Sequence, residues 1–456
     1  MTALSTSRRL LGPGRIRPVG VVIAALVLAA GSYVAAAVVP AHPAPRPIGT
    51  TATQLALPAA QDGAFADLDD IDSQLAIWAP KAAADARDDI SAGNVAILYL
   101  ARGRFTGDAA DYERALSAAD RAVTANPAST GTRTLKATVL QATHDFRGAL
   151  ALATSILAEE PGNIDAIVVS GDADVELGRL ADAAAAYKQV EATIPGPSLD
   201  ARLARLAWLS GDAREAVRLA TQARDEAVGN DELSDPSFYA AQLGEMARLT
   251  GDAATAKTAY DDALATRSTN QLALLGRARL EAFGGADTAA IADLRTAAAI
   301  APRPETLGLL ADLLDRIGDH AGATQQADTI GVIERLGGTS ALLFDRQIVG
   351  FDLDHGRATP TVLGRARAAA DIRPDAAGLD TVAWAAYRLG DLAAARTESA
   401  RALASGSIDA RILYHAAAIA LASGDATGRA LVGRALDLGP ALDPLDRASA
   451  EALLRG

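Results

Sequence analysis

The sequence predicts an all-α protein that forms a solenoid of about ten helix–turn–helix units. A glycine-containing turn recurs along the chain at steps close to 34 residues, and a fixed period of about this size is typical of stacked helical repeats. Three prolines keep the same spacing and stop consecutive segments: Pro127, Pro161 and Pro195. Aromatic residues make up only 4% of the chain, so the expected core consists mainly of alanine and leucine, which favour helices.

Charge and composition exclude several functions. The formal net charge of −13 argues against a nucleic-acid partner, because binding to nucleic acid depends on a basic surface. The chain contains no cysteine, which excludes disulfides, thiolate catalysis, cysteine-based zinc sites and lipid attachment at cysteine. A hydrophobic content of 50% excludes global disorder.

The chain begins with a short basic segment, residues 1–18, followed by an uncharged apolar segment, residues 19–39. About 20 helical residues span the core of a bilayer, so the second segment predicts a single-pass transmembrane helix or a signal peptide. No lysine or arginine follows until Arg46, and the positive-inside rule then places residues 1–18 in the cytoplasm and the rest of the chain outside.

Two fates of the apolar segment stay open. Its length exceeds that of the apolar region of a usual signal peptide and favours retention in the cell membrane. Small residues at 35–37 and 41–44 offer cleavage sites, and cleavage would give a secreted protein. Residues 7–11 also resemble a twin-arginine export motif. Each route places the repeats outside the cytoplasmic membrane.

The segment 40–63 is rich in proline and alanine and joins the apolar segment to the repeats. Its prolines, between Pro40 and Pro47, favour an extended spacer that lifts the domain off the membrane. A disordered tail is equally compatible with this sequence.

Short helical segments flank the repeats. Residues 64–90 are expected to form an N-terminal helical cap with helices over 67–78 and 82–90, and residues 442–456 a C-terminal capping helix over 447–454. The ends of a solenoid need caps because the end units would otherwise expose an apolar face.

Small and large side chains recur at fixed places between residues 91 and 441. The clearest unit contains Leu243, Gly244, Gly251, Asp252, Ala256, Tyr260, Ala263 and Leu264. A second contains Gly171, Gly178, Ala183, Tyr187 and Pro195, a third Ala278, Gly285, Ala290, Ala297 and Pro302, and a weaker fourth Gly350, Ala369 and Pro374. On these residues the segment 91–441 resembles the tetratricopeptide repeat family, and about ten units in register make the resemblance specific.

Each recurring residue has an expected packing role. The turn glycine is expected to adopt a positive φ, and the residue after it to cap the second helix. Gly244 and Ala256 are expected where two helices cross closely, and Tyr187 and Tyr260 in the gap toward the next unit. The turn glycines are Gly178, Gly211, Gly251, Gly318, Gly390 and Gly424.

Three places depart from the period. The first turn, at 104–111, is longer than the others, and extra residues are expected at 229–236 and at 336–340. The two later joints are interpreted either as hinges that divide the solenoid into blocks or as surface loops, which a fold tolerates at little cost.

The five histidines do not form a metal-binding motif. His42 lies in the linker, His144, His320 and His355 in or beside turns, and His415 on a helix. No HExxH pair occurs, so the histidines are interpreted as solvent-exposed residues.

The acidic segments give no stronger indication of a metal-binding site than the histidines do. Residues 352–356 begin like a calcium-binding loop, but Leu363 stands where a bidentate glutamate is needed, so a turn is expected. Residues 67–72 are expected to be a solvated helix N-terminus, with a weak cation site as the alternative. Phosphate-binding loops, dinucleotide fingerprints and nucleophile elbows are missing from the sequence, and we therefore predict no enzyme activity, no cofactor and no metal ligand.

The family resemblance implies a binding groove. In this family the first helices of successive units line a concave groove that receives peptides or partner segments. Aromatic and arginine side chains on such a surface are typical anchors, whereas packing within the solenoid is the alternative for the tryptophans and Tyr387. The groove-facing positions carried over to this chain are Arg205, Trp208, Glu245, Arg279, Asp312, Phe351, Asp354, Trp384 and Tyr387.

The predicted function is a non-enzymatic protein–protein interaction scaffold. We expect it to be anchored in the membrane through residues 19–39, with its repeats outside the cytoplasm, and to bind a protein or peptide of unknown identity in the groove. The alternative is an assembly or stability factor for a neighbouring envelope or transporter complex.

Overall fold

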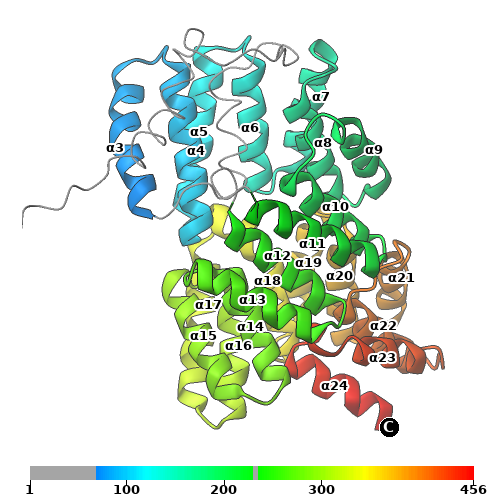
Figure 1. Cartoon of the computed structure of the whole chain (residues 1–456). Coiled ribbons are helices and arrows are strands. Elements are labelled where there is room, and N and C mark those ends of the chain that lie inside the picture. Colours follow the sequence, from blue (N-terminus) through cyan, green and yellow to red (C-terminus); the bar gives the residue numbers. More distant parts are fainter. Residues whose placement is uncertain (1–67, 230–234, 456) are drawn as a thin grey trace, which may run out of the picture.

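The computed structural model describes residues 68–229 and 235–455, and these residues form an all-helical solenoid (Figure 1). They contain 22 α-helices and no strand, which confirms the predicted fold class. Pairs of antiparallel helices form ten consecutive units: α4 (Asp89–Thr106) with α5 (Ala109–Ala125), α6 (Thr130–Ala142) with α7 (Phe146–Glu159), α8 (Ile164–Glu176) with α9 (Leu180–Val190), α10 (Pro197–Leu209) with α11 (Ala213–Val228), α12 (Pro236–Leu249) with α13 (Ala253–Thr266), α14 (Gln271–Phe283) with α15 (Asp287–Ile300), α16 (Pro304–Arg316) with α17 (His320–Leu336), α18 (Gly338–Asp354) with α19 (Pro360–Ile372), α20 (Ala376–Arg388) with α21 (Leu392–Leu403), and α22 (Ala410–Ala422) with α23 (Gly428–Asp437).

A helix flanks the units at each end. The N-terminal one is a single helix, α3 (Leu68–Ala84), so the expected second helix over 82–90 is wrong. Asp88 is the reason, because its carboxylate accepts a hydrogen bond from the Ser91 amide and starts α4. At the other end, the short 3₁₀ helix η2 (Gly439–Ala441) leads into α24 (Pro444–Arg455), which contains the expected helix over 447–454.

Glycines in the left-handed region close the first helix of most units. The six turn glycines have φ values between 73° and 89°, which confirms the predicted turn. The aspartate after the glycine caps the second helix, as Asp252 does by accepting a hydrogen bond of 3.0 Å from the Thr255 amide. In one unit Arg179 takes this position and makes no such cap.

Small residues allow the helices of a unit to approach closely. A Cβ added to Gly244 would lie 2.6 Å from the ring of Tyr260, and one added to Gly276 in the next unit would lie 2.1 Å from the same ring. Tyr260 is fully buried between the two units, as the sequence predicts. The pairing of a small residue with a large one thus fixes the stacking of neighbouring units.

The two long joints differ from the expectation. The predicted loop at 336–340 is wrong, because α17 and α18 are each 17 residues long and only Gly337 separates them. The extra residues therefore lengthen two helices, and the positive φ of Gly337 and Gly338 provides the sharp change of direction. Most of the other predicted insertion, 229–236, lies outside the described residues.

Within the described parts of the chain, 68–229 and 235–455, no helix combines the length and hydropathy that a bilayer crossing requires. The predicted membrane segment 19–39, the linker 40–63 and His42 lie outside these residues.

The solenoid winds so tightly that its successive superhelical turns touch. The turn within each of the first five units contacts a later part of the chain. For the first four units this part is the start of the unit six units later, and for the fifth it is the start of the C-terminal cap. The Arg303 side chain donates a hydrogen bond of 2.9 Å to the Arg104 carbonyl, across 199 positions of sequence. Likewise, a Cβ on Gly211 would lie 2.6 Å from the Gly406 carbonyl oxygen. Figure 1 shows the later units, from α19 on, beside α10–α12.

His144 replaces the turn glycine of the second unit and shows how this contact is maintained. It is the one described non-glycine residue with a positive φ, 63°. Burial and the neighbouring Arg373 guanidinium lower the pKa of His144 to about 4, so its imidazole is neutral at pH 7. Its Nδ1 then donates a hydrogen bond of 3.0 Å to the Leu342 carbonyl in the next superhelical turn.

The contact between superhelical turns predicts a difference between two similar glycines. Gly211 and Gly390 have φ values of 88° and 83°, but only the first faces another superhelical turn, since a Cβ on Gly390 would meet nothing within 4 Å. Gly390→Ala should cost about 1–2 kcal/mol for the left-handed backbone alone. Gly211→Ala should cost measurably more in the free energy of unfolding, measured in urea. Equal losses for the two variants would contradict close packing between the superhelical turns.

Candidate binding site on the inner face of the superhelix

The first helix of each unit lines the inner face of the superhelix, and among the described residues these helices line three cavities. Their volumes are about 300, 350 and 580 Å³, and we call them the first, second and third cavity. Eight of the nine groove positions taken from the sequence line at least one of them. Tyr387 does not, because its ring stacks on Trp384 with ring centroids 5.1 Å apart.

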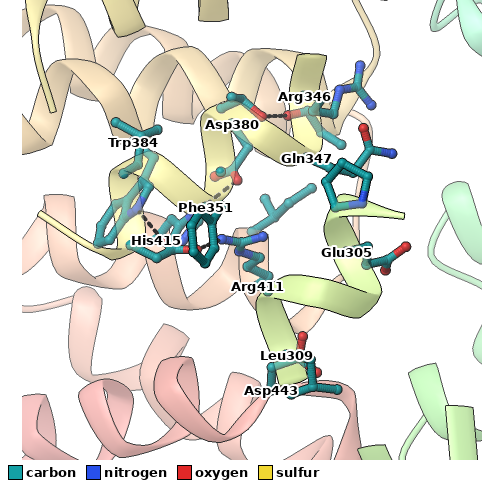
Figure 2. Close-up of a pocket in the computed structure, with 18 of the residues that line it drawn as sticks. Glu305, Leu309, Arg346, Gln347, Phe351, Asp380, Trp384, Arg411, His415 and Asp443 are labelled. Carbon is teal, nitrogen blue, oxygen red and sulfur yellow. Dashed lines mark hydrogen bonds and ion pairs between the residues drawn. The ribbon is translucent and has the colours of Figure 1, made fainter. Parts of the chain in front are cut away.

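Five of these eight residues line the first cavity: Arg279, Asp312, Phe351, Asp354 and Trp384. Figure 2 labels two of them, Phe351 and Trp384. Trp384 is only 4% exposed and packs face to face against His415, with ring centroids 4.0 Å apart. Its indole Nε1 donates a hydrogen bond of 3.1 Å to Asp354. Trp384 thus packs within the solenoid, as the alternative interpretation expects.

A histidine also packs inside the first cavity. The ring of His355 lies 4.0 Å from that of Phe351, and its Nε2 lies 2.8 Å from a carboxylate oxygen of Asp312. Although burial lowers the pKa of His355, the hydrogen bond with Asp312 and its negative charge outweigh burial and raise that pKa above its ordinary value.

The second cavity is lined by both signs of charge. Glu176 binds the guanidinium groups of Arg205, at 2.7 Å, and of Arg373, which belongs to the next superhelical turn. Burial alone would raise the pKa of Glu176. The positive charges of the two guanidinium groups outweigh burial and lower the pKa to about 2. The carboxylate is therefore ionised at neutral pH and joins the two superhelical turns.

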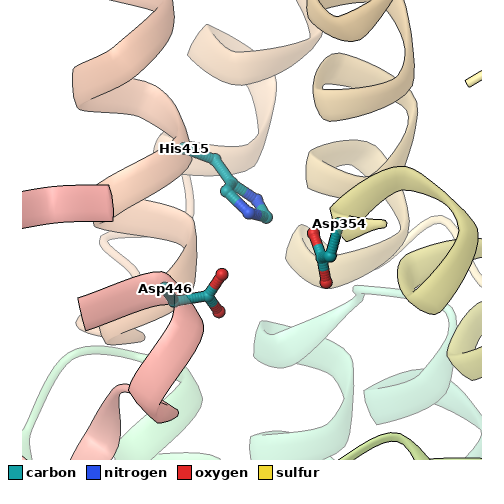
Figure 3. A group of neighbouring side chains, drawn as sticks. All are labelled: Asp354, His415 and Asp446. Carbon is teal, nitrogen blue, oxygen red and sulfur yellow. The ribbon is translucent and has the colours of Figure 1, made fainter. Parts of the chain in front are cut away.

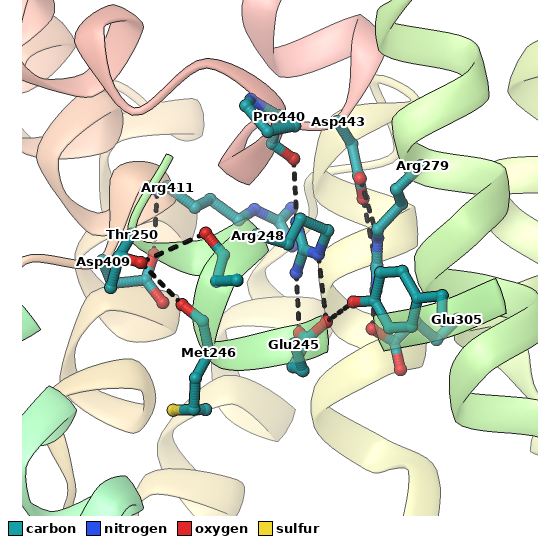
Figure 4. Close-up of polar contacts among 12 residues, drawn as sticks. Glu245, Met246, Arg248, Thr250, Arg279, Glu305, Asp409, Arg411, Pro440 and Asp443 are labelled. Carbon is teal, nitrogen blue, oxygen red and sulfur yellow. Dashed lines mark hydrogen bonds and ion pairs between the residues drawn. The ribbon is translucent and has the colours of Figure 1, made fainter. Parts of the chain in front are cut away.

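An ion-pair network lines the third cavity (Figure 4). Arg248 donates hydrogen bonds of 3.0 and 2.7 Å to the two carboxylate oxygens of Glu245, and Tyr260 donates a third, of 2.7 Å. Burial raises the pKa of Glu245, and Arg248 offsets this and lowers it to about 2. Removing one partner of such a buried pair typically costs about 3–5 kcal/mol, since it leaves the other charge unpaired.

The same network holds the C-terminal segment inside the superhelix. Arg248 also donates a hydrogen bond of 2.9 Å to the backbone carbonyl of Pro440. Arg279 binds both carboxylate oxygens of Asp443, at 2.9 and 3.3 Å, and one oxygen of Glu305, at 2.7 Å.

The remaining aromatic residue of the predicted set, Trp208, is half-buried against the third cavity.

The interpretation of the histidines as solvent-exposed is wrong for two of the four described ones. His415 is 2% exposed and His144 is partly buried, whereas His320 and His355 are exposed, as the sequence predicts. His144 is covered by Leu342 and Arg373 of the next superhelical turn, whereas His415 packs against Trp384 and Asp380 of the neighbouring unit.

Several residues of the site escaped the sequence analysis. Arg248 follows Glu245 by three positions on one helix, a spacing that favours an ion pair and could have indicated it. Asp443, Arg373 and Arg411 gave no such signal, because their partners lie far away in the sequence. His415 and Asp446 escaped as well, and they lie close to Asp354 in a group that could hold a metal ion.

Comparison with known proteins identifies the repeat. Residues 140–207 match the family model described as tetratricopeptide repeat. A search of curated proteins finds no match.

The solved structures that match this chain are distant in sequence. A human IFIT1 dimer with PPP-AAAA is 14% identical, with 84% of this chain and 94% of that chain covered and a TM-score of 0.46. The type IV pilus biogenesis factor PilW is 16% identical, with 46% and 96% covered and a TM-score of 0.39. Cut9–Hcn1 of the APC/C is 13% identical, with 84% and 81% covered and a TM-score of 0.39.

The paired Glu176 predicts a stability difference that depends on pH. Its folded-state pKa, about 2, lies below the ordinary value of 4.5, so its contribution is present above pH 4.5 and is lost as the pH falls toward 2. Glu176→Gln should lower the free energy of unfolding by about 3 kcal/mol at pH 7 and by about 1 kcal/mol at pH 3.

Urea unfolding at both pH values measures this difference. Glu159→Gln is the matched control, because Glu159 pairs with Arg133 on the exposed surface and its loss should have a small effect at either pH. If the difference in the free energy of unfolding between wild type and Glu176→Gln does not decrease as the pH falls, the low pKa of Glu176 is contradicted.

Proposed function

We propose that this chain, which carries tetratricopeptide repeats, is a non-enzymatic scaffold that binds a protein or peptide segment on the inner face of its superhelix. Tetratricopeptide repeats in general mediate protein–protein interactions. Here the inner face combines cavities with fixed donors and acceptors, and such a surface can recognise a polypeptide by its backbone and a few side chains.

One observation carries the proposal: the inner face already binds a polypeptide segment, the chain's own residues 439–443. Arg248 recognises a backbone carbonyl of this segment and Arg279 a carboxylate side chain. A backbone carbonyl is common to all peptides, and the bidentate contact with a carboxylate selects for an acidic residue. The groove is therefore suited to a segment that presents carbonyl oxygens and at least one carboxylate.

The remaining space lies on either side of this segment. The first cavity is lined by the amide of Gln347 and the hydroxyl of Thr381, and Gln242 lies between the second and third cavities. Uncharged groups of this kind donate and accept hydrogen bonds without the desolvation cost of a free charge. We assign these cavities to the partner segment.

The proposal includes the place of the scaffold in the cell. Residues 19–39 anchor the chain in the membrane, residues 1–18 stay in the cytoplasm, and the repeats act outside it. The support for this arrangement is the charge asymmetry around the apolar segment.

Site-specific photocrosslinking tests the groove. A photoreactive amino acid at Gln347 or Trp208, on the inner face, should form adducts with one partner in native cells, and mass spectrometry should map them to a single short segment. The matched outer positions are Lys257 and Val332, which are exposed on second helices. Adducts that arise equally from inner and outer positions, or from outer positions alone, would refute binding in the groove.

A reporter fusion tests the topology separately. Alkaline phosphatase fused after Gly49 should be active, since this enzyme folds only outside the cytoplasm, and the same fusion with residues 19–39 deleted should be inactive. Activity of a cytoplasmic reporter at the same position would overturn the exported arrangement and leave the groove proposal intact.

A further inference from the structure

One buried histidine nitrogen on the inner face lacks a partner. His415, in α22, is 2% exposed, and its Nδ1 lies 2.8 Å from a carboxylate oxygen of Asp380 in α20. Its other ring nitrogen, Nε2, is buried and makes no hydrogen bond within the described residues. A buried nitrogen without a partner is costly, so this atom calls for a ligand.

The ring of His415 lies beside two carboxylates (Figure 3). Asp354 comes from the C-terminal end of α18 and Asp446 from the first turn of α24, and both lie close to His415. One ligand atom from each of the three residues lies within 4.8 Å of the other two. Three separate helices thus direct one nitrogen and two oxygens toward a common point.

The charges at this point favour a divalent cation. The three carboxylates of Asp354, Asp380 and Asp446 carry −3, and the guanidinium of Arg411, which contacts Asp354 and Asp446, carries +1. With a neutral imidazole these four side chains therefore sum to −2, which a divalent ion would neutralise. The positive charge of Arg411 is already included in this sum, so Arg411 cannot neutralise the remaining −2.

We propose that Asp354, His415 and Asp446 bind a divalent transition-metal ion of the Zn²⁺ type. An imidazole nitrogen with two carboxylate oxygens suits zinc and its neighbours, whereas Ca²⁺ and Mg²⁺ prefer oxygen ligands alone. Asp380 orients the ring, because it accepts the Nδ1 proton and leaves the Nε2 lone pair directed at the metal.

An ion can reach this site from the inner cavities. Asp354 and His415 line the first cavity and Asp446 lines the third, so the site lies between the two. The cavities leave room for water at a fourth coordination position. Because Asp446 belongs to α24, the bound ion fastens the C-terminal helix to α18 and α22 and strengthens closure of the superhelix.

Zinc binding to the full-length chain tests the site. The protein is purified without a histidine tag, stripped with EDTA and titrated with ZnCl₂ by equilibrium dialysis with metal analysis. We expect one tight equivalent per chain, which His415→Ala and Asp446→Asn abolish. Asp380→Asn should weaken binding by about 10–100-fold. His355→Ala is the matched control and should leave binding unchanged, since His355 lines the same cavity but pairs with Asp312.

X-ray absorption of the zinc-loaded wild type tests the site without any substitution. It should show one imidazole and otherwise oxygen ligands. Failure of the wild type to bind zinc, binding that His415→Ala leaves intact, or a spectrum without imidazole would each overturn the proposal. If the wild type binds no zinc and His415 is protonated, then a proton occupies the site in place of a metal ion.

Discussion

The contact between successive superhelical turns determines the rest of this structure. The turn of an early unit packs against the chain about six units later, and the backbones approach so closely that glycine is required at Gly211. Hydrogen bonds cross the same boundary between residues 192 to 199 positions apart. A solenoid with an open concave face thereby becomes a closed superhelix with internal cavities.

Closure explains the chemistry of the inner face. Side chains that would be solvated in an open groove are brought out of water, so each charge needs a partner. Glu176, Glu245 and Arg279 satisfy this need with ion pairs, two of which join different superhelical turns. The C-terminal segment enters the same network and lies beside the cavities that we assign to a partner. Binding and closure therefore draw on the same arginines.

The sequence predicts the local structure well because local contacts produce it. The left-handed glycines, the aspartate caps and the pairing of Gly244 with Tyr260 all act within one unit or between neighbours. The helices that face inward follow from the same period. Closure could not be predicted, since it depends on small rotations between units that accumulate over the solenoid. For this reason the role of Asp443 was missed.

The most direct test of the account is a crosslink between two superhelical turns. The chain has no cysteine, so Ser210→Cys and Ser405→Cys, two exposed serines beside the contact of Gly211 with Gly406, give a unique pair. A short bis-thiol reagent should join them within one monomer at high yield and low protein concentration. Absence of this link in the monomer, while each single variant reacts fully with the reagent, would contradict a closed superhelix.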